Sequence, residues 1–230
     1  MPYQLQYSLK AVILAGGRGK RLRPITDYVP KPLIPLNNIP IIEWQIKYLK
    51  KQGVNEIIIC TGYKAEMIKN YLEMKNNFRI KIKFSVEKTP LGTGGAIKQA
   101  CLSIKDKSFF VLNGDTITNI NLKQLAKKQN AIASIELKTK FGIMETQNDI
   151  VTKFKEKKEV SELWMNAGLY HLQNEVLKDL PKKGDIEKTI FPDYAKKGKL
   201  RTVKFKNVFW YSIDSFKDIE ECSEELNKNK

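Results

Sequence analysis

Three glycines and four cations lie within ten residues near the start of the chain, in the segment AGGRGKRLRP at residues 15–24. Glycines let backbone N–H groups approach a phosphate closely, and cationic side chains neutralise its charge. Downstream, Lys31 lies between two prolines that restrict its loop. Neither the GxxxxGK[ST] pattern of a P-loop nor the GxGxxG pattern of a dinucleotide turn occurs in the chain. The two segments therefore predict a phosphate-binding loop of a different kind.

The elements that must position these residues alternate between short apolar runs and amphipathic segments. The predicted strands are residues 10–15, 56–61, 80–86, 109–112 and 131–137, and the predicted helices are residues 40–52, 64–72, 94–105 and 122–129. This alternation predicts an α/β fold with a mixed, mostly parallel sheet flanked by helices. Ligands bind at the carboxyl ends of such strands. The glycine-rich loop and the sequence Asn-Gly-Asp at 113–115 both lie at that edge.

The remainder of the chain is more irregular. Short strands are predicted around Ile143 and at residues 151–154, 169–172 and 200–205. We interpret residues 140–209 as an insertion that completes the other side of one cleft. No linker separates the halves, so one domain over residues 1–230 is expected.

The chain is strongly basic, with 41 Lys and Arg against 25 Asp and Glu and a formal charge of +16. Arginine is the usual reader of bases, yet most of the cations are lysines spread along the chain, which argues against a nucleic-acid partner. A basic protein also attracts small anionic substrates. The sequence shows no secretory signal or membrane-spanning run, and its 3 cysteines are far apart, so a cytoplasmic protein without disulfides or a CxxC zinc site is expected.

Six motifs together resemble those of the sugar-1-phosphate nucleotidyltransferases, in family order over nearly the whole chain. They are LAGGRGKRLRPIT at 14–26 followed by KPLIP at 31–35, PLGTGGA at 90–96, LNGD at 112–115, FKEK at 154–157, NAGLY at 166–170 and the late segment at 209–218. The glycine-rich form of the loop at 90–96 looks closest to the mannose-1-phosphate and heptose-1-phosphate guanylyltransferase branch. The resemblance implies a Rossmann-like, glycosyltransferase-A-like fold.

The resemblance also implies the reaction. An oxygen of a sugar 1-phosphate attacks the α-phosphorus of an NTP, GTP by this likeness, and pyrophosphate leaves to give an NDP-sugar for nucleotide-sugar and cell-surface polysaccharide biosynthesis. Such chemistry depends on positioning, Mg²⁺ and cations more than on a protein nucleophile. The only histidine, His171, is accordingly interpreted as structural.

Roles follow by position in the motifs. Arg21, Lys31 and Asp115 are expected to be catalytic, and Asp115 and Asp214 to bind the metal. The nucleotide is expected to contact Leu14, Ala15, Gly16, Gly17, Gly19, Gly92, Thr93 and Gly94. The sugar phosphate is expected to contact Glu156, Lys157, Asn166 and Gly168. The half at about 8–139 would bind the nucleotide and the half at about 140–220 the sugar phosphate.

The chain departs from the family pattern in two places. Lys20 replaces the Thr or Ser that the family often has. The second metal aspartate is expected at position 212, where this chain has serine, while Asp214 replaces the family's glycine. Asp214 either reaches the metal from there or caps the helix expected to begin near Phe216.

The sequence leaves other substrates and another function open. The donor could be UTP, dTTP or CTP, with another phosphorylated acceptor, or the protein could be a catalytically silent regulator that binds nucleotide sugars. The length predicts no C-terminal β-helix of the kind that many relatives carry, and a homodimer is left open. The intact Arg21, Lys31, Asp115 and Lys157 favour an active enzyme.

Overall fold

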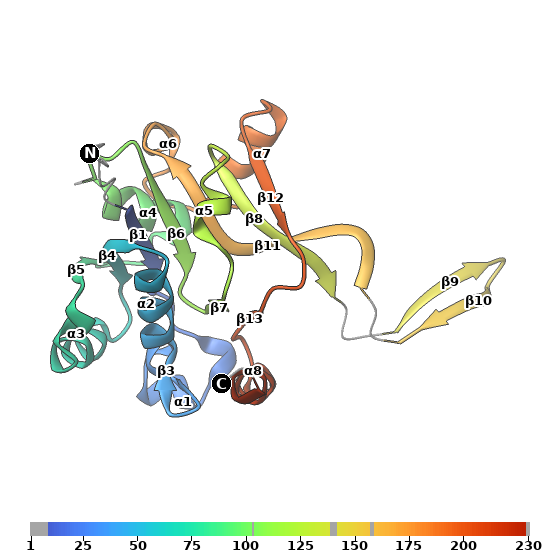
Figure 1. Cartoon of the computed structure of the whole chain (residues 1–230), viewed down its shortest axis with the longest axis horizontal. Coiled ribbons are helices and arrows are strands. Elements are labelled where there is room, and N and C mark those ends of the chain that lie inside the picture. Colours follow the sequence, from blue (N-terminus) through green and yellow to red (C-terminus); the bar gives the residue numbers. More distant parts are fainter. Residues whose placement is uncertain (1–8, 103, 139–141, 157–158, 229–230) are drawn as a thin grey trace, which may run out of the picture.

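A seven-stranded sheet in the order β12-β8-β11-β6-β1-β4-β5 forms the centre of the molecule (Figure 1). The computed structural model describes residues 9–228 except 103, 139–141 and 157–158. The strands are β1 (Leu9–Leu14), β4 (Val54–Thr61), β5 (Lys81–Val86), β6 (Ser108–Asn113), β8 (Ala131–Lys138), β11 (Glu159–Gln173) and β12 (Arg201–Phe205). Only β11 runs antiparallel to its neighbours, β6 and β8. The expected α/β fold with a mixed, mostly parallel sheet is confirmed.

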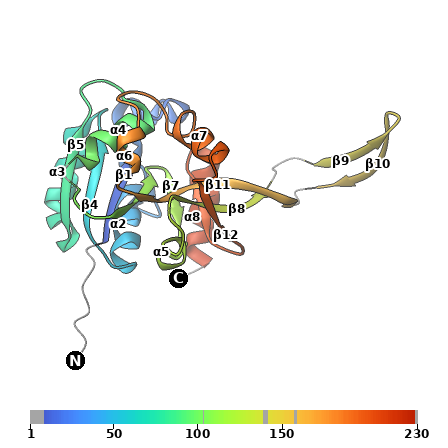
Figure 2. The same cartoon turned by 90° about the horizontal axis from the view of Figure 1, so that it is seen from above.

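Helices cover both faces of the sheet (Figure 2). One face packs against α2 (Ile41–Lys51), α3 (Ala65–Met74) and α5 (Leu122–Leu125), and the other against α4 (Gly92–Cys101), α6 (Val176–Asp179) and α7 (Ile190–Lys196). In β1, Ala11 and Ile13 face the first layer and Val12 faces the second. Strands buried on both faces need apolar residues at every position, which explains their continuous apolar runs.

A third and smaller apolar cluster lies outside the main sheet. Its residues come from the segments that follow the glycine-rich loop and from the C-terminal part of the chain. Its buried members are Leu22, Ile34, Leu36, Ile41, Ile117, Ile213 and Cys222. The elements involved are the short helices η1 (Lys20–Leu22), α1 (Ile25–Tyr28) and η2 (Lys31–Leu33), the pairs β2 (Pro35–Leu36) with β3 (Ile39–Pro40) and β7 (Thr116–Thr118) with β13 (Trp210–Ser212), and α8 (Phe216–Lys228). We call this cluster the loop core.

The two-stranded hairpin of β9 (Ile143–Gln147) and β10 (Ile150–Lys155) projects away from the body (Figure 1, Figure 2). Its large apolar side chains are exposed, including Met144 at 57% and Phe154 at 62%. The expectation that residues 140–209 form an insertion that completes the other side of one cleft stays a prediction. The hairpin extends outward, whereas β11 and β12 pair with β6 and β8 in the main sheet.

The predicted strands and helices of the first half all form, with changes at their ends. The helix predicted at 122–129 stops at Leu125, because Leu122 and Leu125 are its buried residues and the next ones are mostly exposed lysines and glutamine. The strand predicted at 169–172 extends over 159–173, because it pairs with a strand on either side. The sequence did not predict the short elements between β1 and α2, which are η1, α1, η2, β2 and β3, nor η3 (Asn76–Arg79), β7, α6, α7 and β13.

The remaining expectations concern cysteine, histidine and the membrane. Cys60 and Cys101 are fully buried in the core, as expected. His171 is buried with its ring 5.1 Å from that of Phe110, and its Nδ1 lies 2.9 Å from the carbonyl oxygen of Lys128, which suits a structural role. Across the residues described, no helix combines the length and apolarity that crossing a membrane requires.

Glu56 is a buried charge near the start of β4, next to the edge strand β5, and is 6% exposed. Its carboxylate pairs with Lys81 at 3.0 Å and Lys83 at 2.7 Å on β5, and Lys10 of β1 lies 3.9 Å away. Burial by itself raises the Glu56 pKa, but hydrogen bonds from Lys83 and Lys81 and the charge of Lys10 outweigh it, so the pKa is lowered. Glu56 therefore stabilises the fold above its unfolded pKa, and this contribution is lost as pH falls through the folded pKa.

We predict that Glu56→Gln lowers the free energy of unfolding at pH 7 by about 1–3 kcal/mol, the range for hydrogen bonds to a charged group. The difference from wild type should shrink as pH falls below about 4, where the wild-type carboxylate also becomes neutral. Urea unfolding over a pH series measures both effects. Glu73→Gln, at an exposed position of α3, is the control for loss of one charge. A difference that is constant with pH would contradict the assignment.

Candidate active site

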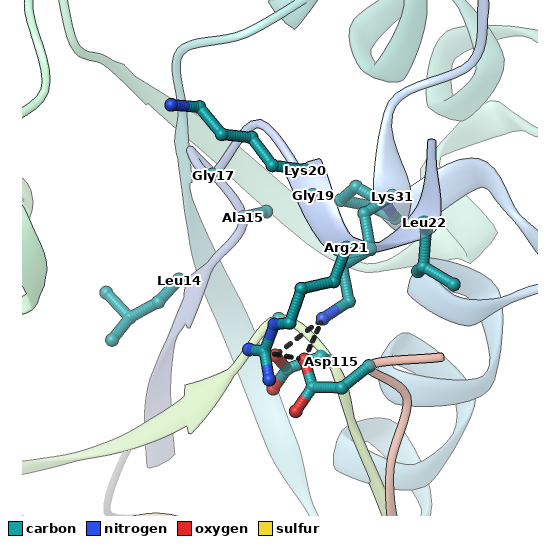
Figure 3. Close-up of a pocket in the computed structure, with 12 residues that line it drawn as sticks. Leu14, Ala15, Gly17, Gly19, Lys20, Arg21, Leu22, Lys31 and Asp115 are labelled. Atoms are coloured by element: carbon teal, nitrogen blue, oxygen red, sulfur yellow. Dashed lines mark hydrogen bonds and ion pairs between the residues drawn. The ribbon is translucent and has the colours of Figure 1, made fainter. Parts of the chain in front are cut away.

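A cavity of about 260 Å³ opens at the carboxyl edge of the sheet (Figure 3). It is lined by Leu14, Ala15, Gly17, Gly19, Lys20, Arg21, Leu22, Lys31, Pro32, Gly114, Asp115 and Asp214. Eight of these positions were singled out from the sequence as nucleotide-binding, catalytic or metal-binding. Segments far apart in the chain thus meet in one hollow.

The topology explains why the cavity lies here. After β1 the chain moves outward through β4 and β5, and it then returns to place β6 on the other side of β1. Ligands in open α/β sheets bind at such a reversal of strand order. Leu14 and Asn113 are register partners at the ends of β1 and β6, and the backbone N–H of Gly114 donates to the Leu14 carbonyl at 3.0 Å. A Cβ at Gly114 would collide with that carbonyl, so only glycine allows this approach.

The glycine-rich loop presents backbone donors to the cavity. Within the described part of the chain, the backbone N–H groups of residues 16–21 donate to no acceptor. Gly19 adopts a positive φ of 61°, and the buried Thr26 hydroxyl donates to its carbonyl at 3.0 Å. Lys20 extends away from the carboxylates in Figure 3, whereas Arg21 points toward them. An array of N–H donors with an adjacent guanidinium suits a polyphosphate.

Two connections place the acidic side chains. The Gln45 side-chain amide, on the buried face of α2, donates to the carbonyls of Asn113 at 2.8 Å and Thr116 at 2.9 Å. These bonds hold the turn that carries Asp115. The antiparallel pairing of β7 with β13 ends where the Ile213 N–H donates to the Asp115 carbonyl at 3.0 Å, so Asp214 lies next to Asp115.

The side chains of the cavity form a compact charge network. The Lys31 ammonium is 2.8 Å from Asp115 Oδ2 and 2.9 Å from Asp214 Oδ1, and Arg21 contacts the same Asp214 oxygen at 2.9 Å. The Lys31 side chain is 13% exposed and each aspartate is 28% exposed. Two cations thus balance two carboxylates that would otherwise repel each other.

Asp214 does not cap α8. The Ser215 side chain accepts from the Asp218 N–H at 3.3 Å, and Asp218 reaches back to accept from the N–H groups of Asp214 at 3.0 Å and Ser215 at 2.8 Å. This reciprocal arrangement is a capping box. The Asp214 carboxylate is left to face Lys31, Arg21 and the hydroxyl of Ser212, which donates to it at 3.2 Å.

The acidic pair fits a hard divalent cation. Both carboxylates converge on a single cationic atom, the Lys31 nitrogen, so oxygens of both can reach one positive centre. Within the described ranges, no group of three or more His, Cys, Asp or Glu side chains could hold a metal ion, so this site offers two carboxylates. Mg²⁺ commonly uses one or two carboxylates together with substrate phosphates.

The second motif that was expected to contact the nucleotide lies outside the cavity lining. Gly92, Thr93 and Gly94 form the first turn of α4 and pack against the loop before α7, where the Gly94 N–H donates to the Gly184 carbonyl at 2.9 Å. The Thr93 hydroxyl is bonded to Glu187 at 2.5 Å and so is already engaged. Gly16 lies against the Glu87 carboxylate, which would have to shift to make room for a Cβ at this position.

The residues expected to contact the sugar phosphate are only partly brought together. Gly168, with φ of 68°, lies against Asn113 and Thr116, so it borders the turn that carries Asp115. Asn166 is exposed two residues earlier on β11. Glu156 is exposed next to the end of β10, on the projecting hairpin, and Lys157 lies outside the described residues.

Sequence reasoning missed Gln45, Glu87 and Glu187. Gln45 carried a signal, because it is a polar residue at helical spacing between Ile42 and Leu49 on the apolar face of its helix. Nothing in the sequence distinguishes Glu187 from other surface glutamates, since its partners come from α4 and β11.

Comparisons with known proteins agree with this geometry. The sequence profile of the family described as nucleotidyl transferase matches residues 10–229. D-glycero-α-D-manno-heptose 1-phosphate guanylyltransferase of Campylobacter jejuni is 39% identical over 210 residues, which are 87% of this chain and 93% of that protein. The catalytic subunit beta of mannose-1-phosphate guanylyltransferase from Xenopus tropicalis is 36% identical, over 91% of this chain and 62% of that protein. The crystal structure of HddC from Yersinia pseudotuberculosis with GMP-PN has a TM-score of 0.76 and 28% identity, and it covers 95% of this chain and 99% of that one.

The capping geometry gives a test that is independent of function. We predict that Asp218→Ala lowers the melting temperature by about 2–4 °C, because two backbone N–H groups lose their acceptor at a cost of about 1 kcal/mol. The matched Asp214→Ala should lower it by less than about 2 °C, since Lys31 keeps Asp115 as partner. Differential scanning calorimetry compares the two variants. An equal loss in both would show that Asp214 has the capping role after all.

Proposed function

Because this chain belongs to the nucleotidyl transferase family, we propose that it transfers GMP from GTP to a sugar 1-phosphate and releases pyrophosphate. The acceptor we propose is a heptose 1-phosphate, since the heptose-1-phosphate enzyme matches over 93% of its length. Mannose 1-phosphate is the second candidate, on the 36% identity to the Xenopus subunit.

One observation carries the proposal. The Lys31 ammonium joins the Asp115 and Asp214 carboxylates in a cavity whose other wall is the glycine-rich loop with its free N–H groups. Backbone N–H donors for phosphate, two cationic side chains and a pair of carboxylates thus surround one cavity. These are the groups that phosphoryl transfer needs. The intact network favours an active enzyme over a silent nucleotide-sugar-binding homologue.

In this proposal the glycine-rich loop holds the triphosphate through its backbone N–H groups. The Arg21 guanidinium bonds to one Asp214 oxygen and has further donors for the phosphates, so it stabilises the charge that develops on departing pyrophosphate. Lys31 faces the α-phosphate region next to Asp115. An oxygen of the sugar phosphate forms the new bond to the α-phosphorus while the bond to the β-phosphate oxygen breaks.

Asp115 and Asp214 would hold Mg²⁺, with Ser212 supporting Asp214. When bound, the ion neutralises phosphate charge and lowers the barrier to bond breaking. Gly168 and Asn166 border the acceptor side, and Gly92, Thr93 and Gly94 support the nucleotide side from α4. We also propose that Glu156 and Lys157 serve the sugar phosphate, and that the halves at about 8–139 and 140–220 divide the two substrates between them.

We predict that GTP is the preferred donor when five NTPs are tested against heptose, mannose, glucose and N-acetylhexosamine 1-phosphates. Pyrophosphate release measures turnover, and mass spectrometry identifies the GDP-sugar. Heptose 1-phosphate should give the highest kcat/KM. A clear preference for UTP, dTTP or CTP would reject the donor and keep the reaction class, whereas no turnover with any pair would reject the function.

We predict that Asp214→Asn reduces turnover by about tenfold or more and raises the Mg²⁺ concentration needed for half-maximal rate. The physical reason is the loss of one of two carboxylate charges from the site. Asp193→Asn, which removes an exposed ion pair with Lys197 on α7, is the matched control and should change neither quantity. Near-normal kinetics of Asp214→Asn at low Mg²⁺ would leave Asp115 as the only protein carboxylate on the ion.

A further inference from the structure

Four side chains outside the cavity lining form one continuous hydrogen-bonded network. The Thr93 hydroxyl donates to Glu187 Oε2 at 2.5 Å, and the Tyr170 hydroxyl donates to Glu187 Oε1 at 3.2 Å. The Asn166 side-chain amide donates to the Tyr170 hydroxyl at 3.0 Å, and its oxygen accepts from the Gly168 N–H at 2.8 Å. The network therefore connects α4, the loop before α7 and β11.

The ionised carboxylate sets the direction of every bond in this network. A carboxylate only accepts, so the Tyr170 hydroxyl must use its proton toward Glu187. Its oxygen can then only accept from Asn166, which turns the Asn166 amide so that its own oxygen meets the Gly168 N–H. Burial raises the pKa of Tyr170, and the charge of Glu187 raises it further, so the hydroxyl keeps its proton.

The far end of the network reaches the turn that carries Asp115. Gly168 leaves so little room that a Cβ there would lie 2.8 Å from Asn113 Nδ2 and 2.9 Å from the Thr116 hydroxyl. Tyr170 itself is fully buried with its ring 5.0 Å from that of Phe191, so its hydroxyl has little freedom to turn elsewhere.

We propose that Glu187 is a positioning residue for the acceptor substrate, acting through Tyr170 to fix the orientation of the Asn166 amide beside Gly168. The proposal rests on the proposed function, because it assigns the exposed Asn166 to the sugar-phosphate side. Glu187 touches no reacting group. Its negative charge determines which side of the Asn166 amide, donor or acceptor, is presented to Gly168, which borders the turn that carries Asp115.

A purely structural role predicts a different result. If Glu187 only tied α4 to the loop before α7, its loss would lower stability and would affect both substrates alike or neither. A positioning role predicts a selective change in the KM of the sugar phosphate, and this change must pass through Tyr170.

The experiment is a double-mutant cycle of Glu187→Gln and Tyr170→Phe, with kcat, both KM values and the melting temperature measured for each variant. We expect Glu187→Gln to raise the sugar-phosphate KM by about tenfold while the GTP KM changes by less than about twofold. Tyr170→Phe should give a similar increase. The double variant should be no worse than the larger single effect, since both act on one path.

Tyr194→Phe is the matched control, because the buried Tyr194 hydroxyl donates to the Asp179 carboxylate at 2.5 Å in the same kind of pair outside the cavity lining. It should lower the melting temperature and leave both KM values unchanged. An unchanged sugar-phosphate KM in Glu187→Gln, an equal rise in both KM values, or additive effects in the double variant would overturn the proposal. Absence of GDP-sugar formation by the wild type would instead reject the proposed function itself.

Discussion

The contact of one ammonium group with two carboxylates organises the functional edge of this molecule. Lys31 pairs with Asp115 and Asp214, which lie 84 and 183 residues away in the chain. Two partly buried carboxylates that contact the same Lys31 nitrogen repel each other unless cations are present. Lys31 and Arg21 supply the balancing charge. The same four groups that stabilise one another are therefore the groups that can exchange partners with phosphates and a divalent cation.

This network depends on the loop core. Each charged residue lies within three residues of a buried apolar anchor, such as Leu22 beside Arg21 and Ile213 beside Asp214. The charged side chains themselves stay at the cavity surface. The main sheet has its own apolar clusters on its two faces, and the charged side chains of the site belong to neither.

The one antiparallel strand of the main sheet, β11, makes a second set of connections at this edge. β11 is antiparallel to β6, and it carries Asn166, Gly168 and Tyr170 past the turn that follows β6. Backbone pairing thus brings the residues proposed for the sugar phosphate to the same edge of the sheet as the glycine-rich loop. The Glu187 carboxylate then links this strand to α4, so Thr93 and Tyr170, which are 77 positions apart in sequence, share one acceptor.

The sequence by itself determined the local chemistry: the glycine-rich loop after an apolar strand, Lys31 between prolines, and Asp115 after β6. Each depends on residues close in the chain, whose backbone preferences and periodicity are local properties. The tertiary structure alone decided that Asp214 faces Lys31, because that outcome depends on the register of β7 against β13 and on Ser215 and Asp218 taking the capping role. It also decided the outward course of the β9–β10 hairpin and the partners of Glu187. These depend on which distant surfaces pack together, and local sequence does not encode that information in a readable form.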